Sequence, residues 1–98
     1  MDKGKIYKKN KNIIERNIVG DWMLIPVHGD MADMQSVFSL NELGYFIWQR
    51  VDGQTPVMKI LQHILAEFDT DEKNAECDLS VFLEKLEARR MVFPVEVV

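Results

Sequence analysis

Few residues of this chain could do chemistry, and their spacing does not favour catalysis. His28 and His63 lie far apart in the sequence, and neither has an acidic residue at the spacing of a zinc-binding helix motif. Cys77 is the only cysteine, which excludes an internal disulfide and any multi-thiolate zinc site within one chain. We expect Cys77 to be a buried, inert thiol, and we expect no metal site.

An acidic run is the remaining candidate for acid–base chemistry. It consists of Asp69, Asp71, Glu72, Glu76 and Asp78. General acid–base catalysis would need a pocket that shifts the pKa of one carboxyl group, and no feature of the sequence indicates such a pocket. Helix capping and a solvated helix face explain the run better. Because the chain also lacks a phosphate-binding loop, a dinucleotide fingerprint and a nucleophile elbow, we expect a protein that is not an enzyme and has no cofactor.

The composition indicates one small domain with an uneven charge distribution. The 98 residues carry a formal net charge of −4. Lysines gather near the N-terminus, whereas acidic residues dominate from Glu67 to Glu87. Since nucleic-acid binding relies on phosphate contacts from Lys and Arg, the acidic body argues against a nucleic-acid partner. We expect residues 1–11 to form a flexible basic arm and residues 12–98 to form a single domain.

Hydropathy argues against a membrane location. No apolar run approaches the roughly 20 residues of a membrane span. The basic residues at the start are not followed by the apolar segment of a signal peptide. We therefore expect a cytoplasmic protein that has no membrane partner.

The first half of the chain has the pattern of short strands. The β-branched and apolar run from Asn12 to Val19 and the run Trp22-Met23-Leu24-Ile25 flank Gly20-Asp21, which predicts a β-hairpin closed by Pro26. Residues 28–35 form a predicted loop. Polar and apolar residues alternate over residues 36–40, which predicts a third short strand.

The second half has the pattern of three helices. Asn41 is a good N-cap for the first, which is predicted to end at Gly53. Thr55 as N-cap and Pro56 as first residue predict the start of the second. Asp69 or Asp71 caps the third, which ends near Arg89-Arg90. The predicted buried positions are Leu43, Phe46, Ile47, Val51, Val57, Ile60, Leu61, Ile64, Leu65, Phe68, Ala75, Leu79, Phe82, Leu83 and Leu86.

This order predicts an α+β fold, winged helix-turn-helix-like, with a three-stranded antiparallel sheet followed by three helices. The third strand is expected at the edge of the sheet, where its unpaired N–H and C=O groups could pair with an extended peptide. The third helix carries a second, weaker apolar ridge of Cys77, Val81 and Ala88, flanked by Asp78 and Lys85. The ridge is either a wider core face or a docking surface, and the pattern alone favours the core face.

Several segments together resemble the PqqD family. They are "LNELGYFIW" (residues 40–48), "DG" (residues 52–53), the helix to "EFD" (residues 67–69), "DLSVFLEKLEARRMV" (residues 78–92) and, upstream, "ERNIVGDWMLIPV" (residues 15–27). The resemblance implies a non-catalytic recognition element for ribosomally made precursor peptides, whose leader adds as a strand to the third β-strand and lies against the third helix. It also implies a radical S-adenosylmethionine (radical SAM) enzyme as partner, in pyrroloquinoline quinone synthesis or a related pathway.

By position, the resemblance assigns two sides of a peptide-binding site. The strand side is Ser36, Val37, Phe38 and Ser39, and the helix side is Asp78, Val81, Phe82 and Lys85. Backbone pairing would give affinity, and alternate side-chain pockets would give specificity.

Two other functions stay open at this point. A winged-helix DNA-binding regulator would share the architecture, but it needs a basic recognition helix, and the second helix offers only Lys59 and His63. A structural subunit could dimerise through the same edge strand. We expect a monomer or a weak homodimer.

Overall fold

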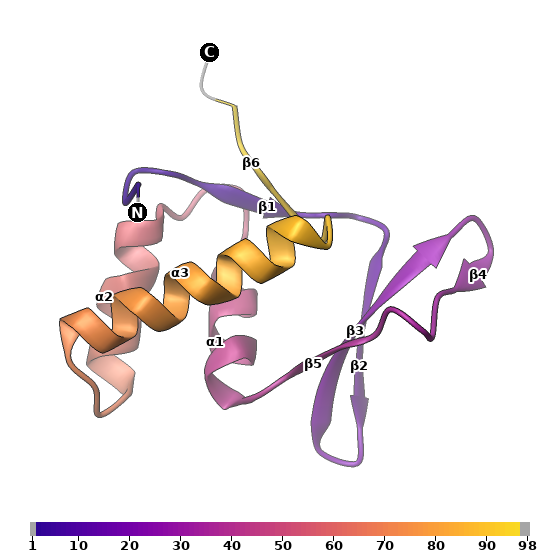
Figure 1. Ribbon diagram of the computed structural model, residues 1–98, viewed down its shortest axis with the longest axis horizontal. Helices are drawn as coiled ribbons and strands as arrows, with labels where there is room; N and C mark the ends of the chain where they lie inside the picture. Colours follow the sequence, from indigo (N-terminus) through magenta and orange to yellow (C-terminus); the bar gives the residue numbers. More distant parts are fainter. Residues whose placement is uncertain (1, 97–98) are drawn as a thin grey trace.

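The computed structural model describes residues 2–96, which form antiparallel sheets and three helices (Figure 1). The strands are β1 (Tyr7–Lys9), β2 (Ile13–Ile18), β3 (Asp21–His28), β4 (Met31–Ala32), β5 (Phe38–Leu40) and β6 (Val92–Pro94). The helices are α1 (Glu42–Arg50), α2 (Val57–Glu67) and α3 (Glu72–Ala88). The α+β class is confirmed, whereas the winged-helix label stays a prediction.

The predicted hairpin is confirmed as β2 and β3, and its turn lies one residue earlier than expected. Ile18 pairs with Asp21, so the two turn residues are Val19 and Gly20. Both have positive φ angles, 53° and 86°, which is the backbone of a type I′ turn. Glycine adopts this conformation freely, whereas a β-branched valine rarely does.

The prediction of a three-stranded sheet is wrong, because the sheet has four strands. The predicted loop after His28 contains β4, which pairs back onto the end of β3 across Gly29-Asp30. β5 pairs with the other half of β3. The third strand is also shorter than predicted. A turn at Asp33, whose carboxylate accepts the N–H of Gln35, leaves residues 36 and 37 outside the strand.

Within residues 1–11, for which the sequence predicts a flexible arm, Tyr7–Lys9 form strand β1. β1 pairs with β6, a strand that the sequence reading did not anticipate, and the Tyr7 side chain is 8% exposed. The carbonyls of Lys3 and Lys5 accept the N–H groups of Met58 and Val57 at 2.8 and 2.9 Å. Since these are first-turn amides of α2, the N-terminal segment satisfies helix donors that would otherwise lack partners.

This arrangement explains why Thr55 is not the cap of α2. The helix begins after Pro56, which offers no side-chain acceptor. The Asp52 carboxylate accepts the N–H and the hydroxyl of Thr55, together with the N–H of Gln54. These backbone hydrogen bonds hold the pKa of Asp52 below its usual value. Thr55 therefore closes the α1–α2 turn instead of opening the helix.

The core lies between the three helices and the inner face of the sheet. Leu24 of β3, Ile47 and Trp48 of α1 and Leu79 of α3 are buried in it. Trp48 also donates its indole N–H to Glu15 of β2. The prediction that Cys77 is buried is wrong, because it is exposed on α3 away from this core.

The junction between β5 and α1 is the prediction that the structure confirms most directly. β5 ends at Leu40, and α1 begins at Glu42. The Asn41 side-chain oxygen accepts the N–H of Gly44 at 2.7 Å, as an N-cap does. A single residue therefore sets the orientation of the strand relative to the helix.

We expect Tyr7→Ala to lower the free energy of unfolding by about 3 kcal/mol, the usual range for removing a buried aromatic ring. The loss would arise because Tyr7 holds β1 against the core. Lys8→Ala is the matched control, because Lys8 is exposed on the same strand and should change stability by less than about 0.5 kcal/mol. Urea denaturation measures both. Equal small effects would show that the N-terminal segment is loose.

We expect Asn41→Ala to destabilise the protein by about 1 kcal/mol, because the Gly44 N–H loses its acceptor. Asn41→Asp keeps an acceptor oxygen and should stay close to the original stability. Chemical denaturation of the two variants makes the comparison, and the amide chemical shift of Gly44 reports the cap itself. Equal stability of the alanine and aspartate variants would contradict this role.

Candidate functional site

The hydrogen-bonding phase of β3 follows from the tight hairpin before it. Ile18 and Asp21 flank a two-residue turn, so they form a hydrogen-bonded pair, and such pairs recur at every second position. The N–H of Val27 donates to the carbonyl of Asn12 at 2.8 Å, in phase with this alternation. The backbone groups of the intervening β3 residues, beginning with Trp22, therefore point to the other side, where β5 lies.

This phase leaves the backbone N–H and C=O of one β5 residue pointing away from β3. Trp22 pairs with Leu40 and Leu24 pairs with Phe38, so the backbone groups of Leu40 and Phe38 point toward β3. The N–H and C=O of Ser39, which lies between them, point to the opposite edge. Within residues 2–96, β5 pairs with no strand other than β3. The prediction that the third strand is an edge is confirmed.

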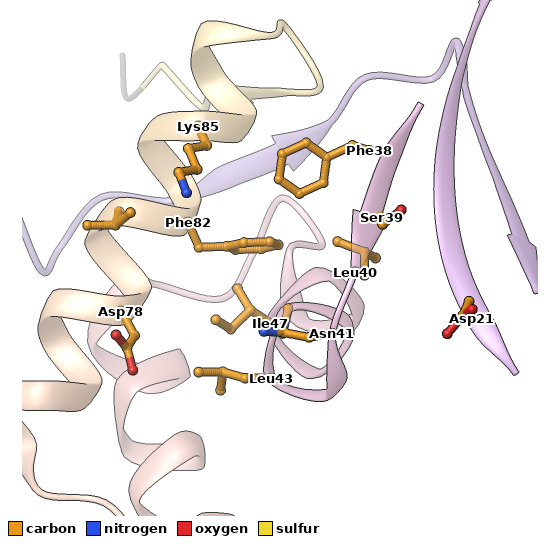
Figure 2. A pocket seen from close by; sticks show the side chains of 12 residues that line it. Asp21, Phe38, Ser39, Leu40, Asn41, Leu43, Ile47, Asp78, Phe82 and Lys85 are labelled. Carbon is orange, nitrogen blue, oxygen red and sulfur yellow. The ribbon is translucent and has the colours of Figure 1, made fainter. Parts of the chain in front are cut away.

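A groove of about 670 Å³ runs between this free edge and α3 (Figure 2). Its floor is the start of α1, which follows β5 directly. The lining residues are Asp21 from β3, Phe38, Ser39 and Leu40 from β5, Asn41, Leu43, Gly44 and Ile47 from the start of α1, and Asp78, Val81, Phe82 and Lys85 from α3. The interior of the groove is therefore mostly apolar, with charged groups at its rim.

Gly44 lets α3 approach the floor of the groove. A Cβ atom at this position would lie 3.1 Å from the Phe82 Cε1 atom and 3.1 Å from the Asn41 side-chain oxygen. Both distances are shorter than ordinary van der Waals contact. A side chain at position 44 would therefore push on the helix wall and on the cap at once.

Aromatic side chains line the groove at the start of β5. The rings of Phe38 and Phe82 meet edge to face, with 6.1 Å between centroids and an interplanar angle of 69°. The Arg89 guanidinium lies 5.0 Å from the centroid of the Phe38 ring. Phe82 is only partly buried, although the periodicity of α3 predicted a core position. It serves as a wall of the groove as well as a margin of the core.

The structure brings together six of the eight site residues assigned from the sequence. Phe38, Ser39, Asp78, Val81, Phe82 and Lys85 line the groove. Ser36 and Val37 do not line it; they precede the strand, where Ser36 is exposed and Val37 half-buried. The reading of the α3 ridge as a wider core face is wrong, because Val81 is 44% exposed and Cys77 is exposed too.

Sequence reasoning missed the residues that α1 contributes. Leu43, Gly44 and Ile47 were read as the ordinary inner face of a helix, or were not singled out. The glycine was an available signal, because glycine in the first turns of a helix, without a turn to make, indicates a close approach by another element.

The groove offers a mostly apolar binding surface. Among residues 2–96, no group of three His, Cys, Asp or Glu side chains could hold a metal ion. None of the helices in that range has the length and apolar character needed to cross a membrane. An apolar cleft beside unpaired strand backbone is suited to an extended chain, whose main chain can pair with Ser39 while its side chains enter the cleft.

Two comparisons place the chain among known proteins. A solved structure described as "TbiB1 in Complex with the TbiA(beta) Leader Peptide" matches with a TM-score of 0.70 and 22% sequence identity, covering 87% of this chain and 93% of that chain. At this identity the likeness shows a shared fold. No curated protein matches the sequence. The family described as Coenzyme PQQ synthesis protein D (PqqD) matches residues 22–92, a range that contains every groove residue except Asp21. The chain therefore belongs to the PqqD family.

Proposed function

We propose that this protein is a non-catalytic peptide-binding module that binds the leader of a ribosomally synthesised precursor peptide by β-strand addition to β5. The observation that carries the proposal is the free edge of β5, which faces an aromatic-walled groove. Membership of the PqqD family supports a peptide ligand. So does the fold shared with TbiB1, which was solved with a leader peptide.

The proposed binding mode uses the backbone first. A strand added to β5 would lie about 4.8 Å from it, in the space between β5 and α3. Its main chain would pair with the N–H and C=O of Ser39, and the alternation continues to Val37 just before the strand. Every second side chain of the peptide would then enter the groove, against Leu40 and Phe82.

We propose that the bound leader is presented to a radical SAM enzyme, in pyrroloquinoline quinone synthesis or a related pathway, in the cytoplasm. The support is the family to which the chain belongs. Strand addition holds only the leader, so the remainder of the precursor stays accessible to a second protein. The protein itself would be a monomer or a weak homodimer. A dimer formed through β5 would compete with the peptide for Ser39, and light scattering with and without peptide would detect that competition.

We expect Ser39→Pro to abolish binding of a synthetic leader peptide, taken from the precursor gene beside this one, while the protein stays folded. Proline removes the outward N–H, which makes no bond to β3, and edge strands tolerate it. Isothermal titration measures binding, and circular dichroism checks folding. Ser39→Thr keeps the N–H and should bind with an affinity close to the original. Unchanged binding by a folded proline variant would overturn strand addition at this edge.

We expect Val81→Asn to weaken binding of the same peptide roughly tenfold, because it replaces an apolar wall of the groove with a polar side chain. Met58→Asn is the matched control, since Met58 is 47% exposed, close to the 44% of Val81, but lies on α2 outside the groove. Stability should change little in either variant. Equal affinities of the two variants would place the ligand elsewhere.

A further inference from the structure

The two ends of the groove carry opposite charges. Asp78 lies at the end where β5 passes into α1, and Asp21 lies near the same end on β3, beyond β5 (Figure 2). Lys85 lies at the opposite end, beside Phe38, and Arg89 follows one helical turn later with its guanidinium on the Phe38 ring. The groove therefore has an acidic end and a basic end, with the apolar surface of Phe82 between them.

These charges are available to a ligand. Among residues 2–96, the ion pairs involve other side chains, and neither Asp21, Asp78 nor Lys85 is in one. All three side chains are exposed. The α1 amino end also lies at the acidic end, but Glu42 in its first turn and the Asn41 cap offset its partial positive charge.

The direction of the ligand follows from the sheet. All strand pairs in the structure are antiparallel, and antiparallel pairing is the more common arrangement in proteins. β5 runs from the basic end at Phe38 to the acidic end at Asn41. A peptide antiparallel to β5 therefore enters with its N-terminal side at Asp21 and Asp78 and leaves with its C-terminal side at Lys85.

The spacing of the charges sets a length. Asp78 and Lys85 are separated by two helical turns, or about 10 Å along α3. An extended peptide rises about 3.4 Å per residue, and side chains on one face recur at every second residue. Two groove-facing side chains four residues apart, with a third between them, are separated by about 14 Å along the strand. This is a few ångströms more than the separation of the two charges, and long charged side chains of the ligand can lean inward to cover the difference.

We infer that the groove selects an extended segment with a basic residue, then an apolar residue two positions later, then an acidic residue two positions after that. This inference rests on the proposed function and specifies its ligand. The basic residue lies beside Asp78, at the end of the groove that Asp21 shares. The apolar residue lies on Phe82 and Leu40, and the acidic residue lies beside Lys85. The order of the charges along the ligand then fixes its direction in the groove.

A displayed library of short random peptides tests the inference without knowledge of the natural precursor. It is selected in parallel on the unmodified protein, on the double variant Asp78→Lys/Lys85→Asp and on Ser39→Pro as the variant without the pairing edge. The double variant keeps the net charge and changes only exposed positions. Enriched peptides are then compared with versions whose two charged residues are exchanged, by fluorescence anisotropy at low and at high salt.

The expected result is enrichment of the basic–apolar–acidic order on the unmodified protein. That order should be lost on the double variant, because Asp21 and Arg89 stay in place and each end of the groove then carries one acidic and one basic side chain. Exchanging the charges of one peptide should weaken its binding roughly fivefold at low salt, and less at high salt because exposed pairs are screened. Two outcomes would overturn the inference and leave the proposed function standing. In the first, peptides are enriched in a way that depends on the Ser39 N–H but show no order of charges. In the second, the double variant enriches the same order as the unmodified protein. No enrichment beyond that on Ser39→Pro would overturn both.

Discussion

The geometry of the groove depends on one hydrogen bond, from the Gly44 N–H to the Asn41 side chain, at the point where β5 becomes α1. It allows a strand and a helix to meet with no linker, so that the two elements cannot rotate freely about each other. The same short stretch holds the Gly44 backbone against the edge of the Phe82 ring. Asn41 and Gly44 therefore fix β5 relative to α1, which forms the floor of the groove. The contact of Gly44 with Phe82 fixes α3, the helix wall, against that floor.

An open strand edge is usually a liability, because it can pair with any exposed strand. This protein limits the risk by keeping β5 to three residues and by placing charged side chains at the groove rim. The aromatic contact between Phe38 and Phe82 narrows the groove at the start of β5. What remains accessible is a short, shaped opening in which backbone pairing and side-chain burial must occur at once, a combination suited to a specific extended ligand.

Local sequence signals were sufficient for features that are formed locally. The N-cap Asn41 and the apolar periodicity of α2 were visible in the residues themselves, because capping and helical burial depend on neighbours within a few positions. The α3 cap was narrowed to two aspartates, of which the structure uses Asp71. The edge position of β5 followed from strand order alone.

Features that depend on distant contacts were missed. β1 and β6 join opposite ends of the chain, and neither run is long enough to predict a strand by itself. Capping of α2 by Lys3 and Lys5 has no local signature, so Thr55 was chosen instead. The residues of α1 line the groove because α3 packs closely on Gly44. The apolar periodicity of α1 could not predict this, because a core face and the floor of a groove have the same pattern.

The central claim is that an extended peptide pairs with β5 and lies against α3. An amide-resolved NMR titration of the nitrogen-15-labelled protein with the neighbouring leader peptide tests it most directly. The account predicts chemical-shift changes concentrated at Ser39 and its flanking residues and at α3 residues around Val81 and Lys85, with the amides of α2 unmoved. Saturable changes confined to α2 or to the β2–β3 turn, with Ser39 unmoved, would contradict it.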